Sequence, residues 1–254
     1  MVFICLPSPT TSSNVTGAKS DVTENESPDP HRVSGPFGDT KSRVSKNVGM
    51  DIAVNLVQAY LRVNGYLTIS ELEVQRKRSD GTYETVTDVD IVGLRLPGEV
   101  YQGDPHQDPD CHMLLIRDEA LRLGPDIIDV ILGEVKEGQA EFNPGLKRHE
   151  VVHSVLRRLD WLYATSLDEV VDEVHRLGLA ESPARGGGVV RTRLVAFGRS
   201  SKTDLHIISL THVVETMLDY MHRFEDVLRP ATYKDPAPAF LNLLVKMGFA
   251  IGKD

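Results

Sequence analysis

The chain has 254 residues, of which 41% are hydrophobic, and a formal net charge of −9 at pH 7. This length and apolar content suffice for one folded domain, and the acidic balance disfavours a general nucleic-acid coat protein, whose phosphate contacts need Lys and Arg. Two cysteines, Cys5 and Cys111, are too few for a disulfide framework and indicate a cytoplasmic protein. No run of about 20 apolar residues occurs, so a membrane-spanning helix is not expected.

The first 49 residues differ in composition from the rest of the chain. They are rich in Ser, Thr, Pro, Gly and Asn, and few large apolar residues follow Leu6. Such a segment cannot bury enough apolar surface to offset its loss of conformational entropy. We therefore predict a disordered tail over 1–49.

The next segment predicts a helix followed by a β-hairpin. Apolar residues recur at helical spacing over 51–64, with Asp51 in the first turn and Gly65 at the end. Apolar and polar residues then alternate over 66–75, with a slip between Ile69 and Leu72 that predicts a bulge. The dipeptide Asp80-Gly81 is a hairpin signal. The expected elements are a helix at 51–64 and strands at 66–75 and 85–94.

Residues 97–125 read as a loop insertion, and a buried strand beginning at 127 follows. Ser166 with Glu169 forms a capping box, Arg185 to Gly188 read as a flexible joint, and Thr211 is a candidate helix cap. The prolines at 230, 236 and 238 indicate a linker. The further expected elements are helices at 146–164, 166–177, 211–228 and 239–247, and strands at 189–197 and 205–210.

Two pairs of charged residues lie on these predicted strands. Residues two apart share one face of a strand, so Asp88 is placed beside Asp90, and Glu134 beside Lys136. A carboxylate and an ammonium at the end of a buried strand are costly unless they pair or hold a ligand. The other interpretation is an exposed cross-strand pair that contributes about 0.2–1 kcal/mol.

The order of elements and these residues resemble the PD-(D/E)XK superfamily of restriction-endonuclease-like nucleases. Its pattern is an Asp before an apolar strand and a later Glu-x-Lys after another, which matches Asp90-Ile91-Val92 and the segment from Ile131 to Lys136. The resemblance implies an α/β fold with an α-β-β-β-α-β core, a mixed sheet flanked by helices, and a C-terminal helical extension. The expected domains are a nuclease core at 50–215 and the extension at 216–254.

The same resemblance implies a hydrolase that cleaves phosphodiester bonds, with DNA as the expected substrate and a homodimer as an allowed assembly. Asp90 and Glu134 would hold Mg²⁺ or Mn²⁺, with Asp88 as a further ligand. Lys136 would orient the nucleophile or balance the charge of the phosphate. Many members of the superfamily also supply a Glu from the first helix, where this chain offers Val54, Asn55 and Gln58.

A second motif suggests a different activity. His149-Glu150-Val151-Val152-His153 is an HExxH sequence on a predicted helix, a pattern that places two imidazoles on zinc with Glu as the base. Glu173 lies at a spacing suited to a third ligand. A zinc metallopeptidase is therefore one alternative, and a catalytically inactive nuclease-like interaction module is another. Solvated helix-boundary histidines explain the motif without a metal.

Overall fold

The computed structural model describes residues 2–6, 51–97, 114–199 and 206–249. Seven strands form one mixed sheet with the order β1-β2-β3-β4-β6-β5, and β7 also pairs with β6. Strands β2, β3 and β4 are antiparallel, whereas β6 runs parallel to both β4 and β7. The strands are β1 (Val2–Leu6), β2 (Leu67–Lys77), β3 (Tyr83–Arg95), β4 (Ile127–Gln139), β5 (Leu179–Pro183), β6 (Val189–Arg199) and β7 (His206–Ser209).

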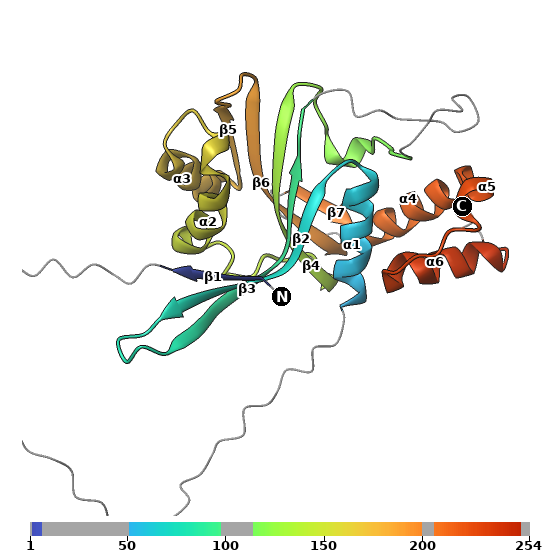
Figure 1. Ribbon diagram of the computed structural model, residues 1–254, viewed down its shortest axis with the longest axis horizontal. Helices are drawn as coiled ribbons and strands as arrows, with labels where there is room; N and C mark the ends of the chain where they lie inside the picture. The colour runs from blue at the N-terminus through green and yellow to red at the C-terminus, as the bar shows by residue number, and fades with distance from the viewer. Residues whose placement is uncertain (1, 7–50, 98–113, 200–205, 250–254) are drawn as a thin grey trace, which may run out of the picture. The chain divides into compact units, whose positions relative to one another are not determined.

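Helices pack on both faces of this sheet, and each face has its own hydrophobic core (Figure 1). One core joins α1, α4 and α6 to sheet residues such as Ile131 and Phe197, and the other joins α2 and α3 to residues such as Leu132. The predicted α/β class with a mixed sheet flanked by helices is therefore confirmed. The helices are α1 (Ile52–Val63), α2 (His149–Leu156), α3 (Leu167–Leu177), α4 (Leu210–Arg223), α5 (Glu225–Leu228) and α6 (Pro236–Lys246), with 3-10 turns η1 (Glu119–Leu121) and η2 (Arg157–Leu162).

Local signals account for the first helix and the hairpin after it. The Asp51 side chain accepts hydrogen bonds from the backbone N–H groups of Ala53 and Val54, which caps α1. At the hairpin, Asp80 accepts from Thr82 N, and Gly81 has a φ of 83° that favours glycine. The irregularity expected between Ile69 and Leu72 is present as Glu71, which has a φ of 53° and is absent from the β2–β3 pairing, whereas the register shift lies between Val74 and Gln75.

Four other expectations are corrected by the structure. The helix expected at 146–164 is the shorter α2 followed by η2, consistent with the tendency of helices to tighten at their C-terminal ends. The joint at 185–188 is the turn between β5 and β6, where Ala184 N donates to Gly188 O. Ser209 rather than Thr211 caps α4. Pro236 lies in the first turn of α6, where its missing N–H costs no helical bond.

The N-terminal prediction is also corrected in part. Val2–Leu6 forms β1 and pairs in parallel with Leu72 to Arg76 of β2, because five apolar residues can extend an open sheet edge. The rest of the expected tail, and most of the insertion at 97–125 with its histidines His106 and His112, lie outside the described residues. Within the described part of the chain, no helix combines the length and the apolar character needed to cross a membrane.

Candidate functional site

The predicted site lies where β3 and β4 separate. The ladder between these strands ends at the pair Ile91–Gly133, so the next N–H of β4 that would face β3 needs another acceptor. Asp90 Oδ2 accepts this hydrogen bond from Val135 N at 2.7 Å. The Asp90 carboxylate is thereby held against the backbone that connects Glu134 to Lys136.

Gly133 allows the two strands to approach each other at this point. A Cβ at position 133 would overlap Cγ2 of Ile91 and lie 3.3 Å from Cε2 of Phe197, and both of these side chains are fully buried. Only glycine fits this gap without displacing a core side chain. The residue before Glu134 therefore fixes the distance between the strands that carry Asp90 and Glu134.

Glu134 and Lys136 point the same way, as the period-two pattern predicts. Lys136 Nζ lies 2.5 Å from Glu134 Oε1, and the two side chains are 44% and 1% exposed respectively. The second oxygen, Glu134 Oε2, is buried and has no hydrogen-bond partner among the residues that the structure describes. A buried carboxylate oxygen without a hydrogen-bond partner is costly for folding, so this atom requires an explanation.

The electrostatics of the two carboxylates are coupled. Burial raises the pKa of Asp90, against the opposing effect of the Val135 N–H and Lys136, and the charges of Asp88 and Asp51 raise it further. Burial also raises the pKa of Glu134, and the charge of Asp90 adds to this effect although Lys136 opposes it. Gathering these carboxylates is unfavourable without a cation, and a bound cation would reverse that cost.

The residues present fit a hard divalent cation with few protein ligands. Mg²⁺ is typically held by one or two carboxylates, with water or phosphate oxygens completing its shell, and Asp90 and Glu134 supply two. Asp88 is exposed on β3, and its negative charge raises the pKa of both Asp90 and Glu134. No group of three or more His, Cys, Asp or Glu side chains suited to a metal occurs among the described residues.

Sequence reasoning missed Asp51 as a neighbour of this site. The sequence placed it in the first turn of a helix, and the structure brings this N-cap close enough to raise the pKa of Asp90. A capping aspartate is an ordinary structural feature, so its pattern alone carries no sign of a contact with another strand. The N-cap of α1 therefore places a carboxylate near Asp90, whereas Val54, Asn55 and Gln58 of the same helix carry no carboxylate.

The two histidines and the glutamate of the HExxH sequence each contact a charged residue of another element. His149 Nε2 faces Asp172 Oδ1 at 3.0 Å, and His153 Nε2 faces Asp168 Oδ1 at 3.3 Å, so each imidazole pairs with an aspartate of α3. Glu150, the expected base, forms an ion pair with Arg76 of β2. These contacts fasten α2 to α3 and β2, and none of them favours the metallopeptidase alternative.

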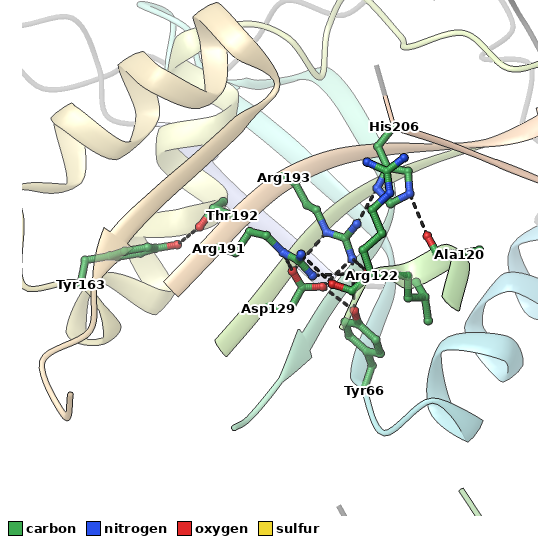
Figure 2. A network of polar contacts seen from close by, with 10 residues as sticks. Tyr66, Ala120, Arg122, Asp129, Tyr163, Arg191, Thr192, Arg193 and His206 are labelled. Carbon is green, nitrogen blue, oxygen red and sulfur yellow. Dashed lines mark hydrogen bonds and ion pairs between the residues drawn. The ribbon is translucent and has the colours of Figure 1, made fainter. Parts of the chain in front are cut away.

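A second buried charge cluster lies around Asp129, which sequence analysis did not single out (Figure 2). Its carboxylate accepts hydrogen bonds from Arg191 Nε at 2.6 Å, from Arg193 Nη2 at 2.7 Å and from the hydroxyl of Tyr66. Burial opposes ionisation, and the two guanidiniums outweigh it and lower the pKa of Asp129. His206 continues the network, since its Nδ1 faces Arg193 and its Nε2 faces the carbonyl of Ala120.

No protein-family model, no curated protein and no solved structure matches the chain.

Proposed function

We propose that this protein is a metal-dependent nuclease with a restriction-endonuclease-like core, and that it hydrolyses phosphodiester bonds of DNA. The observation that carries the proposal is the buried Glu134 carboxylate, which has one oxygen on Lys136 and the other without a partner among the described residues, beside Asp90. The order α1, β2, β3, β4, α2 and then β6 beside β4 supports it, because this is the order that the resemblance implies.

In this proposal Asp90 and Glu134 hold Mg²⁺ or Mn²⁺, and Asp88 is a further ligand from the same strand as Asp90. When bound, such a cation supplies a polarised phosphoryl oxygen and a water of lowered pKa. The Val135 N–H fixes the Asp90 carboxylate, so that little reorganisation is needed when the substrate arrives.

Lys136 has two roles in this account. Its ammonium holds Oε1 of Glu134 and thereby orients Oε2, and its 44% exposed side chain remains within reach of a substrate phosphate. The negative charges of Glu134 and Asp90 raise the pKa of Lys136 against the opposing effect of burial, so the side chain stays cationic. A cation at this position stabilises the charge that develops on the phosphate in the transition state.

The test is a cleavage assay on duplex DNA, single-stranded DNA and RNA in Mg²⁺, with wild type and Lys136→Ala. We expect Lys136→Ala to lower the rate of DNA cleavage by about 10²-fold or more while DNA binding persists, because the transition state loses a charge-assisted contact. Lys246→Ala, which removes a lysine at the end of α6, is the control and should cleave as the wild type does. Equal rates for Lys136→Ala and wild type would contradict the proposal.

A further inference from the structure

A cavity of about 380 Å³ lies between α4 and the segment 116–120, and it shares no lining residue with the cluster of Asp90, Glu134 and Lys136. Its size falls in the range of small-molecule sites, which are about 300–1,000 Å³. One side is formed by α4, and the other by the turn that leads into η1. The proposed nuclease function gives this cavity no role.

The buried Asp129 cluster holds the backbone at 120–122, where the lining segment of the cavity ends at Ala120 (Figure 2). Three successive carbonyl groups accept hydrogen bonds here: Ala120 O faces His206 Nε2 at 3.0 Å, Leu121 O accepts from Arg193 at 2.9 Å, and Arg122 O accepts from Arg191 at 2.8 Å. Fully satisfied buried networks of this kind make a backbone rigid. The lining segment is therefore held in place at its Ala120 end.

Asp118 and His212 form a hydrogen-bonded dyad that lines the cavity. Asp118 is 7% exposed, and its Oδ2 accepts from Tyr60 Oη and faces His212 Nε2, each at 2.7 Å, while its Oδ1 accepts from Ala120 N at 2.9 Å. Burial opposes ionisation, and the hydrogen bonds from Tyr60, Ala120 and His212 outweigh it and lower the pKa of Asp118. An ionised Asp118 orients the imidazole with Nε2–H toward it, and in the neutral imidazole Nδ1 is then the acceptor nitrogen.

The charges around this dyad select the kind of ligand. Arg117 and Arg223 line the cavity together with Glu119 and Asp219, so the lining carries two positive and two negative charges. All four residues are exposed. A polyanion would meet both carboxylates and a polycation both guanidiniums, whereas a ligand that carries one charge of each sign is complementary to the whole set.

We infer that this cavity binds a small zwitterion of the amino-acid class, with its carboxylate at Arg117 and Arg223 and its ammonium donating to His212 Nδ1. The guanidiniums bind a carboxylate through paired N–H donors. The ammonium lies near Glu119 and donates to the imidazole that Asp118 has oriented. A free amino acid and a short peptide share this chemistry, and the cavity volume admits either.

The test is calorimetric titration of the full chain with each standard L-amino acid, with dialanine and trialanine, and with N-acetyl amino-acid amides, which lack both charges. We expect saturable binding of a zwitterion, no binding of the blocked forms, and affinity weakened about tenfold or more in Arg117→Gln and in Arg223→Gln. Arg229→Gln, which removes an exposed arginine paired with Glu225, is the matched control and should bind as the wild type does.

Binding should persist in Lys136→Ala, which separates this inference from the nuclease proposal. Preference for a free amino acid over the peptides, or the reverse, identifies the source of the zwitterion. The inference is overturned if no zwitterion binds saturably, if the blocked forms bind as tightly, or if both arginine variants retain the wild-type affinity. The ring ¹⁵N signals of His212 give an independent readout, because Nδ1 should shift on binding in the wild type.

Discussion

Lys136 Nζ lies 2.5 Å from Glu134 Oε1 and joins a half-exposed ammonium to a carboxylate that is 1% exposed. The pair is incomplete, because Glu134 Oε2 is buried and lacks a hydrogen-bond partner within the described part of the chain. Burying this oxygen without a hydrogen-bond partner disfavours folding. A cation bound to the oxygen would offset that cost. This asymmetry is the basis of the nuclease proposal, and it has consequences for stability as well as for activity.

Replacing Glu134 by Gln should leave the protein at least as stable as the wild type at pH 7. Burial raises the pKa of Glu134, so the carboxyl contributes stability below its ordinary pKa and this contribution is lost as the pH rises through the raised pKa. Gln removes the buried charge, and the half-exposed Lys136 can be hydrated instead. Urea unfolding at pH 7 and at pH 4 should show that any advantage of the variant shrinks at the lower pH.

The control for this substitution is Glu150→Gln, which alters an exposed carboxylate paired with Arg76. Exposed pairs contribute about 0–1 kcal/mol, so we expect a small change at both pH values. A Glu134→Gln variant that is clearly less stable than the wild type at pH 7, with the deficit growing as pH rises, would contradict the assignment of a raised pKa.

Gly133→Ala should destabilise the fold and reduce cleavage together. The added methyl group would overlap Ile91 and crowd Phe197, and overpacking of this kind costs about 1–3 kcal/mol. Separation of β3 from β4 would also displace Asp90 from Glu134. Gly138→Ala on the same strand is the matched control, because a Cβ at that position meets nothing within 4 Å. Partial recovery of stability in the double variant with Ile91→Leu, which lacks the Cγ2 methyl group, would identify the contact, and equal stability of Gly133→Ala and Gly138→Ala would refute it.

Asp129→Asn should cost about 3–5 kcal/mol of unfolding free energy, because Arg191 and Arg193 would remain buried without a charged partner. Chemical denaturation measures this loss. Asp235→Asn serves as the comparison, since Asp235 pairs with Arg62 on the surface, where both side chains are nearly half exposed, and should cost no more than about 1 kcal/mol. Similar losses in the two variants would show that the buried cluster does not stabilise the fold as its geometry indicates.

His206 should remain neutral in the folded protein down to about pH 4. Burial lowers its pKa from 6.5 to about 4, and the charge of Arg193 acts in the same direction. Because this folded pKa is depressed, the associated stability is present above the unfolded value and is lost as the pH falls through the window from about 6.5 to 4. Ring ¹⁵N spectra should show the Nε2–H tautomer, with Nδ1 as the acceptor of the Arg193 hydrogen bond. Titration of His206 near pH 6.5 would be the contrary result.

The parts of the fold that were predictable depend on neighbours in sequence. Asp51 caps α1 through N–H groups two and three residues away, and the period of two places Glu134 beside Lys136 on β4. The cavity dyad was not predictable, because Asp118 meets Tyr60 across 58 residues and His212 across 94. Strand β5 was missed for a related reason: its pairing partner β6 defines it, and its own five residues have a weak strand pattern.

The most direct test of the central claim is calorimetric titration of Mn²⁺ and Mg²⁺ into the wild type, Asp90→Asn and Glu134→Gln. Both substitutions preserve side-chain shape and remove one carboxylate from the separation point of β3 and β4. The account predicts that the wild type binds the cation, that each variant binds it at least about tenfold more weakly, and that the cation raises the unfolding temperature of the wild type alone. Equal affinity in all three proteins would show that Asp90 and Glu134 do not form the metal site.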